Sequence, residues 1–341
     1  MAILLGIALA VIAGFVPMVS YAAIMWWVDR YEKEPWYLIG AAFLWGAVPS
    51  IVLALIAQIF GGLAFGIGLG AEEGLSLSKQ LLMASVMAPV TEEIAKGLAL
   101  LGILLFFRHE IDSLLDGVVY GSIVGFGFAA TENVLYGLQA LGQAGIAGVL
   151  FLGFLRSVVF GLAHAFFTSL TGVGIALARH GKTASVRWLG PILGLGGAMF
   201  AHGLHNLGAT LVQEHVGWLG FSFLFDWGGV AGIAILILVT LSAERRWIET
   251  ELAEEVAEGI LSPGEAALLA SSWRRLGALW RGSGGGGPVP RRNLYAFFSA
   301  ATELAFTKRH MRELGDDPTA RERLDRLRAA VQAARPGGSG A

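Results

Sequence analysis

The sequence contains no cysteine among its 341 residues, and only 15% of the residues are charged. The absence of cysteine excludes disulfides, thiolate zinc sites and cysteine nucleophiles. The low charge separates the chain from soluble globular proteins, in which about 25% of residues are charged. A net charge of -2 gives no reason to expect a nucleic-acid partner. Any chemistry must therefore come from Glu, Asp, His, Ser, Thr, Asn or Lys side chains.

Apolar residues make up 55% of the sequence and form runs of the length that crosses a bilayer as a helix, about 20 residues each. The runs lack the alternation that is typical of the strands of outer-membrane barrels. We therefore predict an all-α fold, a polytopic transmembrane helical bundle of about seven spans in contact with the lipid bilayer. The expected spans are residues 2–28, 36–60, 81–107, 115–138, 147–178, 188–211 and 218–241.

Basic residues are unevenly distributed among the connections between these spans. Only Lys79 lies in the connections after the second, fourth and sixth spans. Cytoplasmic loops of membrane proteins are enriched in Lys and Arg. We therefore expect a multi-pass protein of the cell inner (plasma) membrane, with its N-terminus outside and its C-terminus in the cytoplasm. The basic residues of the other three connections are Arg30, Lys33, Arg108, Arg179, Lys182 and Arg187.

The composition becomes that of a soluble helical segment after the last expected span. We predict a transmembrane domain over residues 1–242 and a cytoplasmic helical tail over residues 243–341, with a flexible Gly-rich linker at 283–290. Within the tail, Ser262, Pro263 and Glu265 follow the order of an N-cap residue, an N1 proline and an N3 glutamate, which predicts a helix start. The tail contains no catalytic motif, and the sequence does not identify a partner for it.

Three glycines recur at four-residue spacing in the fourth expected span: Gly117, Gly121 and Gly125. Residues four apart lie on the same face of a helix. Small residues on one face allow the backbone of a neighbouring helix to approach closely. We therefore predict a close helix contact along this face.

Ionisable side chains interrupt the third expected span, where Glu92, Glu93 and Lys96 lie near the midpoint. Ionised groups inside a bilayer are costly unless they face a hydrated cavity lined by protein, so they mark a candidate functional site. Arg156 is expected either to snorkel or to pair with Glu132. Further polar residues lie at a similar depth in later spans, and we expect them to line one water-filled cavity. They are Glu132, Asn133, His164, Thr168, His202, His205, Asn206 and Asp226.

These residue types suit the hydrolysis of a peptide bond. The reaction needs a base that deprotonates water, donors or positive charge for the oxyanion, and an acid for the leaving amine. A buried glutamate can serve first as the base and then as the acid. The imidazoles could bind zinc together with a carboxylate and leave one position for water. They could equally polarise water and the oxyanion with no metal, and the sequence leaves both routes open.

Four motifs occur in order on successive expected spans: Glu-Glu-x-x-Lys at 92–96, Phe-x-x-x-Glu-Asn at 128–133, His-x-x-x-Thr at 164–168 and His-x-x-x-Asn at 202–206. Together they resemble the PrsW-type intramembrane proteases, which are distant relatives of CAAX-prenyl and bacteriocin-processing membrane endopeptidases. The resemblance covers about residues 1–241. It implies an intramembrane endopeptidase that cleaves a membrane-bound substrate similar to an anti-sigma factor.

The resemblance also implies roles for individual residues. Glu92 and Glu93 would be the essential acid pair, and His164 an essential histidine. His202 and Asn206 would correspond to the last motif, which in the CAAX-type relatives supplies a second histidine and an amide near the oxyanion. On this basis we expect Glu93, helped by Glu92, to activate water, His164 and His202 to position it, and Asn206 to donate to the oxyanion.

A zinc ion is the candidate cofactor, and the sequence leaves its presence undecided. Its candidate ligands are Glu132, His164, His202 and His205, and Glu132 stands where the CAAX-type relatives have a histidine. The residues expected to support the site are Lys96, Asn133, Thr168 and Asp226.

A proton-coupled membrane transporter is the alternative function, because such carriers also bury Glu, His and Lys at the middle of the bilayer. Transporters of this kind are commonly built from inverted repeats. The sequence shows no evident inverted repeat between its halves, and its polar motifs lie on consecutive spans. These features favour the protease.

Overall fold

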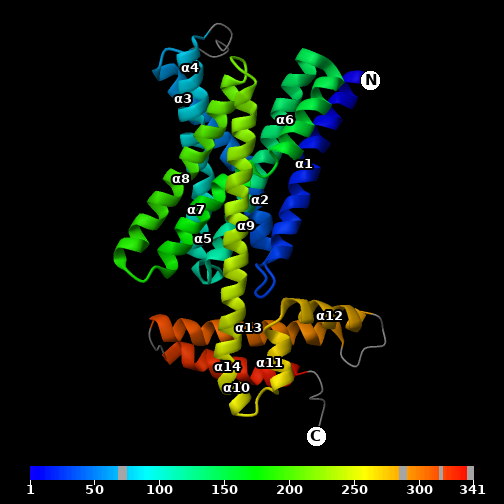
Figure 1. Ribbon diagram of the computed structural model, residues 1–341, viewed down its shortest axis with the longest axis vertical. Coiled ribbons are helices and arrows are strands. Elements are labelled where there is room, and N and C mark those ends of the chain that lie inside the picture. The colour runs from blue at the N-terminus through cyan, green and yellow to red at the C-terminus, as the bar shows by residue number, and fades with distance from the viewer. Residues whose placement is uncertain (68–74, 284–289, 315–317, 336–341) are drawn as a thin grey trace. The chain divides into compact units, whose positions relative to one another are not determined.

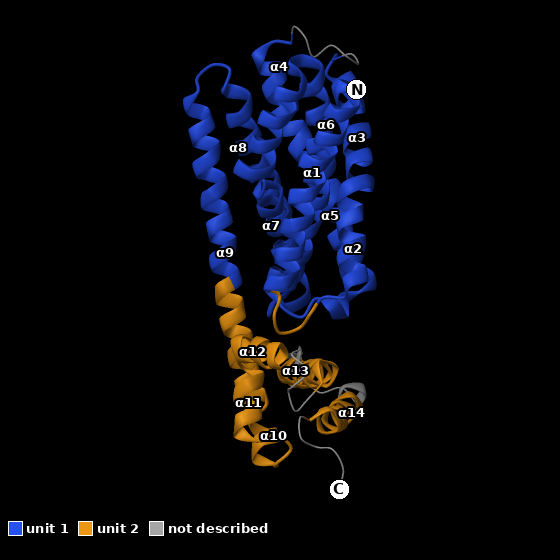
Figure 2. Cartoon of the chain, turned by 90° about the vertical axis from the view of Figure 1, so that its right-hand side faces the viewer, with its two compact units in different colours: residues 1–28, 34–237 blue, residues 29–33, 238–341 orange. Residues whose placement is uncertain are grey.

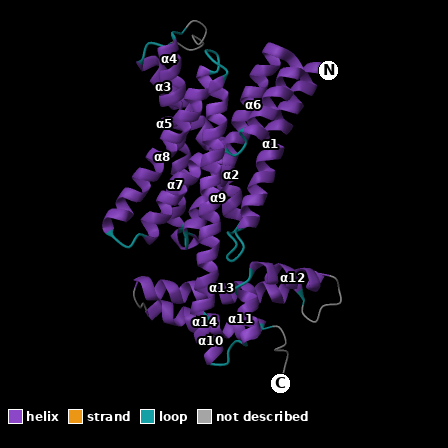
Figure 3. Cartoon of the chain, viewed as in Figure 1, coloured by secondary structure: helices purple, strands orange, loops and turns teal. Residues whose placement is uncertain are grey.

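The computed structural model describes residues 1–67, 75–283, 290–314 and 318–335. In these ranges the regular elements are all helices (Figures 1 and 3). The predicted all-α membrane bundle is therefore confirmed. The Gly-rich linker predicted at 283–290 falls mostly on residues 284–289, which lie outside the described ranges.

The chain forms two compact units (Figure 2). The first contains Met1–Val28 and Glu34–Ile237, and the second contains Asp29–Lys33 and Leu238–Ala341. The short turn Asp29–Lys33 therefore packs with the C-terminal part of the chain, although it connects two helices of the first unit. The helices of the first unit are α1 (Ala2–Val28), α2 (Trp36–Trp45), α3 (Ile51–Ala64), α4 (Leu77–Leu82), α5 (Ala88–Phe106), α6 (Leu114–Phe154), α7 (Ala163–His180), α8 (Ala184–Leu211) and α9 (Gly217–Glu251), of which α9 continues into the second unit.

Short helical turns of other types join several of these helices. Two π-helical turns, Gly46–Ser50 between α2 and α3 and Met83–Met87 between α4 and α5, keep each pair of helices continuous. A third, Leu155–Val159, follows α6, and a 3₁₀ turn at Arg108–Glu110 follows α5. π-helical turns inside helices are frequent at functional sites. Met83–Met87 directly precedes the helix that carries the paired glutamates.

Four helical stretches of the described chain have the length and hydropathy of a membrane crossing: Ala2–Val28, Trp36–Ala64, Leu114–His180 and Gly217–Ala257. The third stretch covers two of the predicted spans. It breaks at Gly145, whose φ of 65° is readily adopted only by glycine. Beyond the break the chain returns beside the first part of α6, since Asn133 Nδ2 donates to Ser157 Oγ at 3.2 Å. The predicted spans at 81–107 and 188–211 correspond to helices that contain the polar residues of the candidate site.

Helix α6 is the central helix of the first unit, and its residues 115–130 are buried without interruption. The predicted glycine contact lies on the side of α6 that faces α7. A Cβ atom at Gly121 would lie 2.6 Å from the carbonyl oxygen of Thr168, and one at Gly125 would lie 2.5 Å from that of His164. These glycines therefore allow α7 to bring its two polar residues close to α6.

The second unit contains five short or amphipathic helices besides the end of α9: α10 (Ala253–Ala257), α11 (Pro263–Leu269), α12 (Ser272–Ser283), α13 (Arg291–Leu314) and α14 (Pro318–Ala334). Their apolar faces form one core, to which Leu252, Leu269, Phe297 and Val331 contribute fully buried side chains. Residues on both sides of 284–289 thus share a single core. The predicted start of α11 is confirmed, because Ser262 and Glu265 form a capping box.

Tyr31 anchors the turn Asp29–Lys33 in the core of the second unit. Its hydroxyl donates to the carbonyl oxygen of Ala270 at 3.0 Å, and its ring lies 5.0 Å from the guanidinium of Arg275. Arg275 in turn donates to Thr302 Oγ1 at 2.8 Å. Burial lowers the pKa of Arg275 to about 10, so the guanidinium stays protonated at neutral pH. The second unit therefore holds the connection between α1 and α2 through specific polar contacts.

Candidate active site

The predicted polar residues of α5, α6, α7 and α8 meet in a group that we call the polar cluster, consisting of Glu92, Glu93, Lys96, Glu132, His164 and His202. Lys96 lies inside it and is fully buried. Its Nζ atom lies 2.6 Å from Glu93 Oε1, 3.2 Å from His164 Nδ1 and 3.8 Å from Glu92 Oε2. A buried ammonium is costly unless it is paired, and these contacts provide the pairing.

Both oxygens of Glu93 accept hydrogen bonds. Oε1 accepts from Lys96 and from Nδ1 of His202, which lies at 2.9 Å. Oε2 accepts from the hydroxyl of Thr168 at 3.1 Å. Because His202 donates through Nδ1, a neutral imidazole keeps its lone pair on Nε2. Glu93 thus sets the orientation of His202 and joins α5 to α7 and α8.

Glu92 has a different environment from Glu93, although the two residues are adjacent. Its Oε1 accepts a hydrogen bond from Gln58 Nε2 at 3.2 Å. Its Oε2 is buried and has no hydrogen-bond partner among the described residues. The same atom lies 3.8 Å from His202 Nε2. One carboxylate oxygen therefore faces an imidazole nitrogen, and that oxygen is available to a ligand or a water molecule.

A second set of contacts holds His164 from the side of α6. Its Nε2 lies 2.8 Å from Glu132 Oε2, which also accepts from Arg156 Nη2 at 2.5 Å. Arg156 donates through Nε to Asn133 Oδ1 at 2.8 Å. The expected pairing of Arg156 with Glu132 is thus confirmed. This series of polar contacts fixes the position of His164. The ring of His164 packs edge-on against the ring of His202, with 5.0 Å between the centroids.

Three of the predicted residues make contacts outside the polar cluster. Asn206 donates through Nδ2 to the carbonyl oxygen of Ala84 at 2.8 Å. His205 Nδ1 lies 2.6 Å from Asp226 Oδ2, so these two residues pair with each other. Sequence reasoning did not single out Gln58, which bonds Glu92. The available signal was a carboxamide in an otherwise apolar span.

The sequence model of the PrsW family, described as intramembrane metalloproteases, matches residues 34–242. The chain belongs to the PrsW family. The matched region contains the whole polar cluster and excludes nearly all of the second unit. This PrsW-family chain is therefore a multi-pass membrane protease, which confirms the predicted family and enzyme class. The transporter alternative receives no support.

Three relatives carry the name Protease PrsW. The one from Geobacillus kaustophilus (strain HTA426) is 26% identical over 218 residues, which cover 63% of this chain and 86% of the relative. The one from Bacillus subtilis (strain 168) is 24% identical over 216 residues, covering 63% and 89%. The one from Clostridioides difficile (strain 630) is 28% identical over 155 residues, covering 45% and 60%. No solved structure matches the chain.

The family description implies a metal, and the side chains of this PrsW-family protease fit one. One possible ligand atom each from Glu92, His164 and His202 lies within 4.8 Å of the others. Two imidazoles and a carboxylate form a ligand set that zinc uses in hydrolases.

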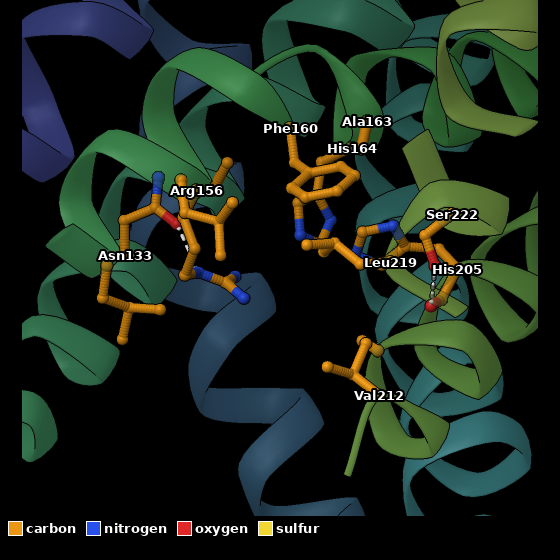
Figure 4. Close-up of a pocket in the computed structure, with 13 residues that line it drawn as sticks. Asn133, Arg156, Phe160, Ala163, His164, His205, Val212, Leu219 and Ser222 are labelled. Carbon is orange, nitrogen blue, oxygen red and sulfur yellow. Dashed lines mark hydrogen bonds between the residues drawn. The ribbon is translucent and has the colours of Figure 1, made fainter. Parts of the chain in front are cut away.

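A pocket of about 240 Å³ lies beside the polar cluster, and His164 forms part of its wall (Figure 4). In the close-up, Asn133 and Arg156 lie on one side of the pocket and His205 and Ser222 on the other. The remaining lining residues are apolar: Ala129, Leu152, Leu155, Phe160, Ala163, Ala209, Val212 and Leu219.

Proposed function

We propose that this PrsW-family protease hydrolyses a peptide bond of a membrane-protein substrate at the polar cluster, with Glu92 deprotonating the attacking water. The observation that supports this role is the buried Oε2 of Glu92, which has no hydrogen-bond partner in the described part of the chain and lies 3.8 Å from His202 Nε2. A water molecule placed there would give a proton to an oxygen that otherwise stays unsatisfied.

The contacts favour different catalytic roles for Glu92 and Glu93 from those expected from the sequence. Glu93 was expected to activate water, but its two oxygens accept hydrogen bonds from Lys96, His202 and Thr168. We therefore assign Glu93 to positioning, because it orients His202 and holds the Lys96 ammonium in place. Glu92, after accepting the proton, can return it to the leaving amine.

Stabilisation of the oxyanion is assigned to Lys96 in this proposal. A preorganised positive charge in a site of low dielectric constant stabilises developing negative charge strongly. Asn206 was expected in this role, but its Nδ2 already donates to Ala84. We propose that Asn206 instead fixes α8 against the π-helical turn Met83–Met87.

Zinc is the proposed metal, with Glu92, His164 and His202 as the residues that would hold it. When bound there, it would polarise the water and the scissile carbonyl, and Glu92 would then serve as a ligand in place of the base. Two other candidate ligands from the sequence, Glu132 and His205, are not part of this group of neighbouring ligand atoms, and they are paired with Arg156 and Asp226. We therefore place them outside the ligand set, as residues that position or surround it.

The substrate and the orientation are proposed from the sequence resemblance and from the distribution of basic residues. We propose a membrane-bound substrate similar to an anti-sigma factor, in the plasma membrane. We further propose that the N-terminus lies outside and the C-terminal unit in the cytoplasm, because the connections after the first, third and fifth spans are the basic ones.

The test compares membrane-protein fragments from cells that produce the wild type or Glu92→Gln. Fragments that depend on Glu92 identify substrates, which are then reconstituted with purified enzyme in vesicles. We expect Glu92→Gln to lower the cleavage rate by roughly 10²- to 10⁴-fold, the usual contribution of general acid-base catalysis. Glu214→Gln, at an exposed position between α8 and α9, is the matched control. Cleavage by Glu92→Gln at the wild-type rate would refute the proposal.

A further inference from the structure

The pocket beside His164 is too small for a typical small-molecule ligand. Its volume is about 240 Å³, whereas sites for such ligands measure about 300–1,000 Å³. A space of this size suits one large amino-acid side chain. Helices α6, α7, α8 and α9 and the turn Leu155–Val159 all contribute to its wall, so its shape depends on the assembled bundle.

The polar side chains in the wall already have partners. His205 pairs with Asp226 at 2.6 Å, and Arg156 bonds both Glu132 and Asn133. Ser222, the remaining hydroxyl of the wall, donates to the carbonyl oxygen of His205 at 3.3 Å. A charged side chain entering the pocket would lose its hydration and would have to compete with these bonds. The apolar remainder of the wall therefore favours an apolar occupant.

His164 connects the pocket to the polar cluster. Its ring lines the pocket, and its Nδ1 atom lies 3.2 Å from Lys96 Nζ. The same ring packs edge-on against the ring of His202, with 5.0 Å between the centroids. A side chain held in the pocket would thus keep its own backbone next to the residues proposed for catalysis. Positioning of this kind contributes to the rate as well as to the choice of substrate.

We propose that this pocket is the specificity subsite for the residue that flanks the cleaved bond, and that it accepts a large apolar side chain such as Leu, Ile, Met or Phe. The inference rests on the proposed function, because it assumes that cleavage occurs at the polar cluster. Ala209 is well suited to a test, since it lines the pocket and its own side chain is exposed. A larger residue there would fill the pocket without disturbing the buried core.

The experiment maps the residues on both sides of each Glu92-dependent cut, in cells that produce the wild type or Ala209→Phe. With the wild type we expect large apolar residues to be enriched at one flanking position. Ala209→Phe should shift the residue preference at that position toward Gly, Ala or Ser. On reconstituted substrate, kcat/KM for a large residue should fall by roughly 10- to 200-fold, the range for a misfitting apolar group. Cleavage of an alanine variant of the same substrate should fall much less, because its side chain does not need the filled space.

Ala184→Phe provides the matched control, because Ala184 is exposed on the same helix and does not line the pocket. It should leave the cleavage profile unchanged. Leu219→Ala, which enlarges the pocket, should extend the preference toward Phe and Trp. The inference is overturned if Glu92-dependent cleavage persists while Ala209→Phe leaves the profile unaltered or lowers the rate for every substrate equally. If the wild type cleaves nothing in a Glu92-dependent way, the proposed function fails, and this inference fails with it.

Discussion

His202 donates a hydrogen bond from Nδ1 to Glu93 Oε1 at 2.9 Å, and this bond fixes which imidazole nitrogen is available in the site. Histidine ligands of metals are commonly oriented by a carboxylate in this way, through the nitrogen that does not bind the metal. The adjacent acid, Glu92, presents an oxygen to the other nitrogen of the same ring at 3.8 Å. The two glutamates therefore lie on opposite sides of one imidazole.

Removal of the charge of Glu93 should destabilise the membrane unit. Glu93→Gln would leave the buried ammonium of Lys96 without its closest counterion, and loss of one partner of a buried pair costs about 3–5 kcal/mol. We expect a clear fall in the thermal unfolding temperature in detergent. Glu92→Gln should cause a much smaller change, because it affects an oxygen without a hydrogen-bond partner in the described chain.

The double variant Glu93→Gln/Lys96→Met tests whether the loss of stability arises from the unpaired ammonium of Lys96. Replacement of both members of a buried pair is often tolerated, so it should recover part of the lost stability. Equal unfolding temperatures for Glu92→Gln and Glu93→Gln would show that the two acids are equivalent.

Zinc content provides a test of the proposed ligand set that does not depend on activity. We expect elemental analysis of the purified wild type to find about one zinc ion per chain, the number that one site would hold. His202→Ala and Glu92→Gln should lower the content strongly, because each removes one of three ligands. Glu214→Gln should retain the ion. Full activity in a preparation free of metal would instead favour hydrolysis by the side chains alone.

The close approach of α6 and α7 should be sensitive to small changes in volume at Gly121. A Cβ atom there would lie 2.6 Å from the carbonyl oxygen of Thr168, so Gly121→Val must push the helices apart. Such overpacking typically costs about 1–3 kcal/mol. Because Thr168 bonds Glu93, cleavage should fall along with stability.

Gly142→Val is the control for Gly121→Val, because beyond the adjacent backbone of its own helix no described atom lies within 4 Å of a Cβ atom at that position of α6. It should change unfolding temperature and cleavage much less. A Gly121→Val protein with wild-type stability would contradict the close contact.

The absence of cysteine makes the proposed orientation directly measurable. A single cysteine at Lys182→Cys should react with a membrane-impermeant thiol reagent only after the cells are opened. One at Glu214→Cys should react in intact cells. Both positions are exposed, so accessibility of the side chain does not limit the reaction. The reverse labelling pattern would place the N-terminus in the cytoplasm.

Several features of this protein were predictable because each depends on a short stretch of sequence. Apolar runs of bilayer length predict helices, since the hydrocarbon core offers no water to backbone polar groups. Acids and imidazoles within such runs predict a shared polar site for the same reason, and the structure brings Glu92, Glu93, Lys96, Glu132, His164 and His202 together. The capping box of Ser262 and Glu265 involves residues only three positions apart, so it was predictable for the same reason.

Only the tertiary structure decided which contacts each of these side chains makes, and therefore which role each can have. Adjacent residues of a helix point in directions about 100° apart, so the pair Glu92 and Glu93 could not be separated without knowing the rotation of α5 against α8. The pairing of His205 with Asp226 and the bond from Asn206 to Ala84 depend on packing between helices distant in sequence. The inclusion of Asp29–Lys33 in the second unit arises in the same way. The sequence determined which residues lie on long apolar helices, because that depends on local composition, and the packing of the helices determined which of their atoms meet.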